Sequence, residues 1–359
     1  MVSARRILIH NSSRATKGGG TKFLKELVNT LMRYGYNIEA VTNPAPSHVG
    51  LLNMLREADV VCWYGESDVG NGLRFVRLAC SMKKPVIRIL GGTVLIRKPD
   101  RPSYLLSNVL TAFNIFAHTK LHPTLFYGVR NTDDYKLLKR FGVPVLYTPP
   151  GVDTKAYRPA GRRDSRFTII CNATPATWVK GTDFLLKIIP EILYTIKEDI
   201  VLVIITGGLG QLSFRQRLMS LEKMFSDNVL CIDKWLSQEE MCKLLGKAHL
   251  LIFPSRSEGF GNLVLEAQIC GVLVVAFNIP GAPRDVVVPN LTGGLVKPYN
   301  LKDFVKEIHR LYIVWRTKPE LYAYMQMKAR ENALRFDWSV VGKLFASHIN
   351  EVYSRMVKI

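Results

Sequence analysis

Short apolar runs alternate with amphipathic stretches along the first 150 residues. The residues at 21–34 repeat at helical spacing, and the apolar stripe consists of Phe23, Leu24, Leu27, Val28 and Leu31. Apolar runs of strand length lie at 6–10, 36–42, 58–63, 85–90 and 143–147. Because buried parallel strands need crossover helices between them, this order predicts a Rossmann-like, doubly wound parallel sheet.

A second series of the same kind follows a Pro-rich segment at 149–159. Its apolar runs lie at 167–171, 200–205, 229–232, 250–253 and 272–277, and a helix is predicted from Thr182. A chain of 359 residues exceeds the size at which one core keeps growing. We therefore predict an α/β protein with domains at 1–150 and 151–336, a cleft between them, and a terminal segment at 337–359 that contains an amphipathic helix.

The segment at 255–267 joins two carboxylates, eight positions apart, through a glycine-bearing turn to an apolar helix start. The free backbone N–H groups of such a turn, with the positive end of the helix dipole, bind phosphate without a cation. Glu258 and Glu266 flank this cradle. The alternative is a first-turn helix acid at Glu266 and a solvated loop charge at Glu258.

A glycine run, Gly18-Gly19-Gly20, lies between the first predicted strand and the first predicted helix. Glycines there let backbone N–H groups approach a ligand, although a flexible turn is the alternative. The chain has neither the G-x-G-x-x-G fingerprint nor a P-loop, which argues against a nicotinamide cofactor and a nucleotide triphosphate site of that kind.

The segment at 255–267 resembles the E-x7-E motif of the family 4 retaining glycosyltransferases. Their GT-B fold has two Rossmann-like domains that face a central cleft. The segment at 149–159 resembles the linker of that family, N-G-V-D-x-x-x-F-x-P, and residues 280–296 resemble a later pattern. By this resemblance the terminal helix crosses back to the first domain. The likeness covers the second domain by residues and the first by the order of its elements.

The resemblance also implies roles for individual residues. Glu266 holds the ribose of a nucleotide, Glu258 lies beside the donor sugar, and the glycine run faces donor sugar and acceptor. The implied donor-binding residues are Glu266, Gly259, Phe260, Gly261, Asn262, Leu263, Gly18, Gly19 and Gly20.

Lys180 matches the lysine of the family's G-R-x-x-x-x-K-G segment, where a cation stabilises the departing diphosphate. With Glu258 it is the implied catalytic pair; the alternative is a surface lysine. The family's arginine is missing, because Asn172 and Ala173 stand in its place. Either a cation from elsewhere substitutes for it or donor activation is weaker; the cations considered are Arg256, Arg14 and Lys17.

Several other residues bear on the site less directly. Trp235 follows a predicted strand near the expected nucleobase position, where it stacks on the base or packs in the core; we favour packing. The family's histidine after the strand at 85–90 is absent, and His118 and His122 receive no role.

These observations predict a retaining glycosyltransferase that moves a sugar from a nucleoside-diphosphate donor to the hydroxyl of a glycan, lipid-linked or small-molecule acceptor. No D-x-D motif and no metal-spaced cluster occurs, so we expect metal-independent transfer without a cofactor. The alternatives are a non-catalytic nucleotide-sugar-binding protein and an epimerase or phosphorylase on the same fold.

The formal net charge of +20 favours acidic partners. Residues 1–150 carry 21 Lys and Arg against 9 Asp and Glu, so the excess leans toward the first domain. An anionic membrane surface, a phosphorylated acceptor and nucleic acid all fit that charge, as does a dispersed solvating surface, but no nucleic-acid-binding module is evident. Six cysteines without a C-x2-C pair predict buried reduced thiols. With no signal peptide or membrane-spanning run recognised, we expect a cytoplasmic protein, peripheral at a membrane if the basic clusters bind one.

Overall fold

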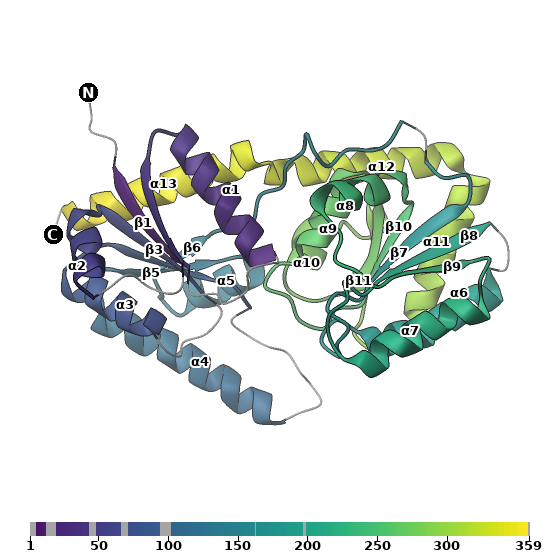
Figure 1. The fold of residues 1–359 in the computed structure, drawn as a ribbon, viewed down its shortest axis with the longest axis horizontal. Coiled ribbons are helices and arrows are strands. Elements are labelled where there is room, and N and C mark those ends of the chain that lie inside the picture. The colour runs from purple at the N-terminus through teal and green to yellow at the C-terminus, as the bar shows by residue number, and fades with distance from the viewer. Residues whose placement is uncertain are drawn as a thin grey trace. The chain divides into compact units, whose positions relative to one another are not determined.

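The computed structural model describes residues 5–11, 19–42, 48–65, 71–93, 102–161, 163–196 and 199–357. The chain forms two compact units (Figure 1). The first unit consists of Met1–Gly151 and Phe336–Ile359, and the second consists of Val152–Arg335.

The first unit is built on a six-stranded parallel sheet in the order β2-β1-β3-β4-β5-β6. The strands are β1 (Arg6–Asn11), β2 (Asn37–Thr42), β3 (Val60–Gly65), β4 (Val86–Leu90), β5 (Leu125–Val129) and β6 (Val145–Tyr147). The helices of its first segment are α1 (Gly19–Arg33), α2 (His48–Glu57), α3 (Asn71–Ser81), α4 (Pro102–Leu121) and α5 (Thr132–Arg140). Successive side chains of β1 point to opposite faces of the sheet and pack in two different cores. Ile7 and Ile9 pack with α1, and Leu8 packs with residues of α2 to α5. Both faces of the sheet are therefore covered, as a doubly wound sheet requires.

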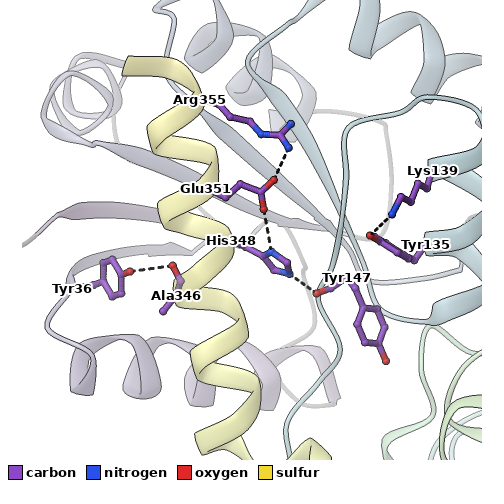
Figure 2. Close-up of polar contacts among 8 residues, drawn as sticks. All are labelled: Tyr36, Tyr135, Lys139, Tyr147, Ala346, His348, Glu351 and Arg355. Atoms are coloured by element: carbon purple, nitrogen blue, oxygen red, sulfur yellow. Dashed lines mark hydrogen bonds and ion pairs between the residues drawn. The ribbon is translucent and has the colours of Figure 1, made fainter. Parts of the chain in front are cut away.

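Helix α13 (Trp338–Val357) completes the first unit. Its buried residues join the core under α1, and Gly342 permits this approach because an added Cβ would lie 2.3 Å from Cγ2 of Thr30. Figure 2 shows two of the polar contacts that fix the helix. The Tyr36 hydroxyl donates to the Ala346 carbonyl (3.2 Å), and Nε2 of His348 lies 2.9 Å from the Tyr147 carbonyl oxygen.

The second unit is built on a parallel sheet in the order β12-β11-β10-β7-β8-β9. Its strands are β7 (Phe167–Asn172), β8 (Ile200–Ile205), β9 (Val229–Ile232), β10 (Leu250–Phe253), β11 (Leu273–Phe277) and β12 (Gly293–Val296). Its helices are α6 (Thr182–Thr195), α7 (Leu212–Met224), α8 (Gln238–Lys247), α9 (Asn262–Ile269), α10 (Ala282–Val286), α11 (Leu301–Thr317) and α12 (Pro319–Ala333), before the 3-10 turn η1 (Leu334–Phe336). A large apolar core joins the sheet to α6, α7, α11 and α12.

The predicted α/β class with two Rossmann-like parallel sheets is confirmed. Some element ends differ. The strand predicted at 143–147 begins at Val145, because the Val143 N–H closes α5 on the Leu138 carbonyl (3.1 Å) and Pro144 has no N–H. All six cysteines are free thiols; four are buried, whereas Cys231 and Cys242 are partly exposed. Within the described part of the chain, no helix is both long and apolar enough to cross a bilayer.

Candidate active site

The second sheet reverses its strand order between β7 and β10. From β7 the order runs outward through β8 to β9, and from β10 it runs the other way through β11 to β12. The two strands pair in parallel, with Leu250 opposite Ile169 and Ile252 opposite Cys171. The loops that leave their carboxyl ends therefore emerge side by side, which is where open α/β sheets form ligand crevices.

Lys180 and Glu258 meet at this switch point. Lys180 ends the loop after β7, Glu258 lies in the loop after β10, and Nζ of Lys180 stands 2.7 Å from Oε1 of Glu258. Their side chains are 23% and 10% exposed. The interpretation of Glu258 as a solvated loop charge, and of Lys180 as a plain surface lysine, is therefore wrong. Both are partly buried and form a charge-assisted pair that retains some access to solvent.

Arg256 fastens the two loops together. Its backbone N–H donates to the Val179 carbonyl (2.8 Å), and its guanidinium donates to both carboxylate oxygens of Asp183 (2.6 and 2.8 Å) and to the Trp178 carbonyl. The guanidinium carbon lies 4.3 Å from the centre of a Trp178 ring, and the side chain is only 3% exposed.

This environment bears on one of the alternatives that the sequence left open. Arg256 does not replace the family's missing arginine, because its guanidinium is committed to Asp183 and Trp178. It acts instead as a positioning residue for the loop that carries Lys180. The other two cations considered, Arg14 and Lys17, lie outside the described residues.

Gly181 explains why a glycine follows Lys180. Its φ of 72° is left-handed, and an added Cβ would lie 2.2 Å from the Pro254 carbonyl oxygen. Only glycine combines that backbone angle with so close an approach to the loop after β10. Gly181 also precedes the first residue of α6, so the turn sets the direction of that helix.

The position of the missing arginine is filled by a small apolar residue. Ala173 is fully buried, and its N–H donates to the Ile205 carbonyl (2.8 Å). Oδ1 of Asn172 accepts from the Thr174 N–H (3.3 Å). Neither residue supplies a cation, so Lys180 brings positive charge to this loop without an arginine at the family's position.

The predicted anion cradle forms the start of α9. Gly261 precedes the helix in the left-handed conformation (φ 97°), and no side chain caps that end. Phe260 is buried and its carbonyl accepts from the Ala282 N–H (2.6 Å), while a Cβ on Gly281 would lie 2.4 Å from the same oxygen. These contacts fix the turn, and no side chain caps the positive end of α9, which favours an anion.

Glu266 lies on α9, beyond its first turn, which contains no acidic residue. The interpretation of Glu266 as a first-turn acid is therefore wrong. Tyr157 of the linker lies near enough to Glu266 for the two side chains to interact electrostatically. Burial, and then the negative charge of Glu266, raise the pKa of Tyr157 far above its usual value. We did not predict this contact, although the linker pattern at 149–159 carries Phe where this chain has Tyr157.

The predicted glycine loop belongs to the first unit. Gly18 lies outside the described residues, whereas Gly19 and Gly20 are the first two residues of α1 rather than part of a loop. A Cβ on Gly20 would lie 2.6 Å from the Tyr64 hydroxyl, so this glycine lets α1 begin close to β3.

Trp235 does not pack in the core as we favoured, because 44% of it is exposed beyond the end of β9. Nearby, the Arg215 guanidinium holds the pKa of Asp233 below its usual range, and Asp233 also accepts from the Thr206 hydroxyl. His118, which received no role, lies in the last turn of α4. Among the described residues, no group of three or more His, Cys, Asp or Glu side chains gathers as metal ligands would.

Known proteins resemble this chain in sequence and in fold. A D-inositol 3-phosphate glycosyltransferase of Nocardiopsis dassonvillei is 28% identical over 238 residues, which cover 59% of this chain and 52% of that protein. A GDP-mannose-dependent monoacylated alpha-(1-6)-phosphatidylinositol monomannoside mannosyltransferase of Corynebacterium glutamicum is 29% identical over 217 residues, covering 55% and 54%. The chain thus spans about half the length of these curated relatives.

The fold matches that of Anabaena HepE, solved in complex with UDP and glucose, with a TM-score of 0.67 and 15% identity over 97% of this chain and 100% of HepE. The family model of the glycosyl transferases group 1 matches residues 153–332, half of the chain and nearly all of the second unit. The chain therefore belongs to the glycosyl transferases group 1 and has the GT-B fold.

Proposed function

We propose that the protein transfers a sugar from a nucleoside-diphosphate sugar to an acceptor hydroxyl, with retention of configuration and without a metal ion. The Lys180–Glu258 pair at the switch point of the second sheet carries this proposal. It sets a cation and a carboxylate beside the uncapped start of α9, where a diphosphate and a sugar would need them.

Each group has a distinct part in that reaction. The bond between the anomeric carbon and the diphosphate oxygen breaks, and its electron pair passes to that oxygen. Lys180 and the N-terminus of α9 stabilise the resulting negative charge. The acceptor oxygen bonds to the anomeric carbon on the same face and gives its proton to the leaving diphosphate. Glu258 holds the donor sugar, and Glu266 accepts hydrogen bonds from the ribose.

The ion pair has a consequence for binding. Lys180 Nζ already has an anionic partner, so a diphosphate must share the ammonium with Glu258 or displace it. An ammonium has three donors, which allows sharing. We expect donor binding to replace the Lys180–Glu258 contact with two others, from Lys180 to the diphosphate and from Glu258 to the sugar.

The acceptor of this reaction is proposed to be anionic or to lie at an anionic membrane. The +20 charge supports this, as do the exposed Phe113 and Phe116, which share one side of α4 with Lys120. The relatives named for inositol phosphate and phosphatidylinositol acceptors point the same way. Sedimentation with phosphatidylcholine vesicles, with and without phosphatidylglycerol, tests the membrane part, which fails if the anionic lipid adds no binding.

Thermal unfolding with UDP, GDP, ADP and their sugar conjugates tests the donor site. A ligand at about 100 times its dissociation constant stabilises by roughly 2.7 kcal/mol. We expect one nucleotide family to raise the Tm of the wild type, Glu266→Ala to abolish that rise, and Glu191→Ala, at an exposed acid of α6, to retain it. No shift with any nucleotide would overturn the proposal.

A second candidate function rests on Ala173. A buried alanine where the family has arginine favours a protein that binds the nucleotide sugar without transferring it. The two functions differ in product: radiolabelled donor incubated with anionic acceptors gives a labelled glycoside in the first case. In the second case the nucleotide binds and no label moves.

A further inference from the structure

Three helices of the first unit end next to one another at the amino edge of its sheet. Helices α3, α4 and α5 share one core on the same face of the sheet, and they lead into the neighbouring strands β4, β5 and β6. Backbone hydrogen bonds join the starts of these strands, from the Val86 N–H to the Thr124 carbonyl (2.9 Å) and from the Tyr127 N–H to the Pro144 carbonyl (2.8 Å). Because the strands are parallel, the C-terminal ends of the three helices meet at this edge and form one surface.

This surface is positively charged. Its exposed basic residues include Lys83 just after α3, Lys120 in the last turn of α4 and Arg140 at the end of α5. No Asp or Glu occurs in the segments that form it, at 75–86, 113–125 and 135–147. At the next strand start along this edge, Glu57 is already paired with Arg6 (2.6 Å). The cations therefore face an anionic partner without local competition from their own segments.

Exposed apolar side chains lie among these cations. Leu121, the last residue of α4, is 71% exposed, and Phe141, which follows α5, is 62% exposed. On α4, Nζ of Lys120 lies 5.6 Å from the ring centre of the exposed Phe116. Cations at helix C-termini offset the helix dipole, but that role needs no exposed apolar neighbours. Apolar side chains surrounded by cations suit the interface of an anionic bilayer.

We propose that this helix-end surface, formed by Lys83, Lys120, Leu121, Arg140 and Phe141, docks on an anionic lipid bilayer. Leu121 and Phe141 enter the headgroup region, and the three cations bind lipid phosphates. The inference rests on the membrane part of the proposed function and assigns it to particular residues. A soluble polyanion such as RNA matches the charge but offers Leu121 no apolar phase, so the bilayer is the better match.

Lys120→Gln/Arg140→Gln tests the charge of the surface. Two cations near an anionic bilayer strengthen binding roughly thirtyfold. We expect sedimentation with vesicles of phosphatidylcholine and phosphatidylglycerol to weaken by about that factor, and the difference to shrink at high salt. Arg217→Gln/Lys223→Gln, at two exposed cations of α7, is the matched control and should bind like the wild type. An equal loss in the control would mean that net charge alone attracts the lipid, which would overturn the assignment.

Leu121→Ser/Phe141→Ser tests insertion. We expect about tenfold weaker binding to the same vesicles, and the difference should persist at high salt because salt does not screen apolar burial. Leu212→Ser/Met224→Ser, at positions of α7 that are 60% and 67% exposed, is the matched control and should keep wild-type binding. All these variants change exposed side chains, so their Tm should stay at the wild-type value.

The outcomes separate this inference from the proposed function. If the wild type binds anionic vesicles and Leu121→Ser/Phe141→Ser binds equally well, only this inference fails; a loss confined to Lys120→Gln/Arg140→Gln would then favour a soluble polyanion as the partner. If the wild type does not bind anionic vesicles, the inference fails together with the membrane part of the proposed function. The donor site is tested independently by thermal unfolding with nucleotides.

Discussion

Three cations at the carboxyl edge of the second sheet are paired with carboxylates, although one of them, Arg256, also lies on a Trp178 ring. Two buried guanidinium groups of the first unit lie on aromatic rings. The pairs of the second unit are Lys180 with Glu258, Arg256 with Asp183, and Arg215 with Asp233. In the first unit, Arg88 lies 4.6 Å from the centre of a Trp63 ring, and Arg130 lies 4.3 Å from that of Phe23.

This difference separates two uses of a buried positive charge. An incoming phosphate competes directly with a carboxylate for an ammonium, so the Lys180 pair can exchange one anion for another. A ring holds a guanidinium through its quadrupole and offers nothing that an anion replaces. We therefore propose anion exchange for the Lys180 pair alone, whereas Arg256 stays with Asp183, and the Arg88 and Arg130 stacks contribute to the packing of the first unit.

The exchange predicts the largest effect for Lys180→Met. The variant removes the cation and leaves Glu258 in place, so we expect kcat for sugar transfer to fall about 10²–10³-fold. Steady-state assays with the donor identified by thermal unfolding measure it. Lys187→Met, at an exposed position of α6, is the matched control and should keep full activity. If kcat of Lys180→Met falls less than threefold, Lys180 does not stabilise the leaving diphosphate electrostatically.

Asp183→Ala tests whether a carboxylate pair also holds the loops. It leaves the 3% exposed Arg256 without its bidentate partner, and an uncompensated buried charge costs about 3 kcal/mol in the free energy of unfolding. Urea unfolding followed by circular dichroism measures the loss, with Asp227→Ala at an exposed acid as the control. A cost below about 1 kcal/mol would mean that the pair does not fasten the Lys180 loop.

Tyr127→Phe gives the smallest effect and probes the ring-held cation. The Tyr127 hydroxyl accepts from Arg88 (3.2 Å), and the variant removes this bond while keeping the ring under the guanidinium. We expect a loss of about 1 kcal/mol in the free energy of unfolding. A loss as large as that of Asp183→Ala would erase the distinction between the two units.

The sequence predicted the two sheets except for strands β5 and β12, and it singled out Lys180 and Glu258 but not the contact between them. Apolar runs reveal strands, but no local pattern shows that β7 pairs with β10. That pairing is what brings Lys180 and Glu258 together, although they lie 78 residues apart in the sequence. Gly181 illustrates the same limit: the motif contains the glycine, but only the structure shows the Pro254 carbonyl that requires it.

Burial explains the residues that sequence reasoning placed wrongly or missed. An arginine such as Arg256 is a common ligand-binding cation, but here it pairs with Asp183, which lies 73 positions earlier in the sequence. The pair forms only when both loops are folded. Trp235 suits a core by type, yet lies exposed past the end of β9. Tyr157 differs from the linker pattern by one hydroxyl, and only the fold brings it near Glu266.

Helix α13 makes the first unit discontinuous in the chain, with a consequence for biosynthesis. On the ribosome, the face of the first sheet that carries Ile9 and α1 lacks Trp338 and Phe345 until the entire second unit has been translated. At about 5–20 residues per second, that apolar face waits on the order of ten seconds or more for its cover. The second unit, continuous from Val152 to Arg335, is free to fold during this interval. The second unit can thus be complete before the unit that began synthesis first.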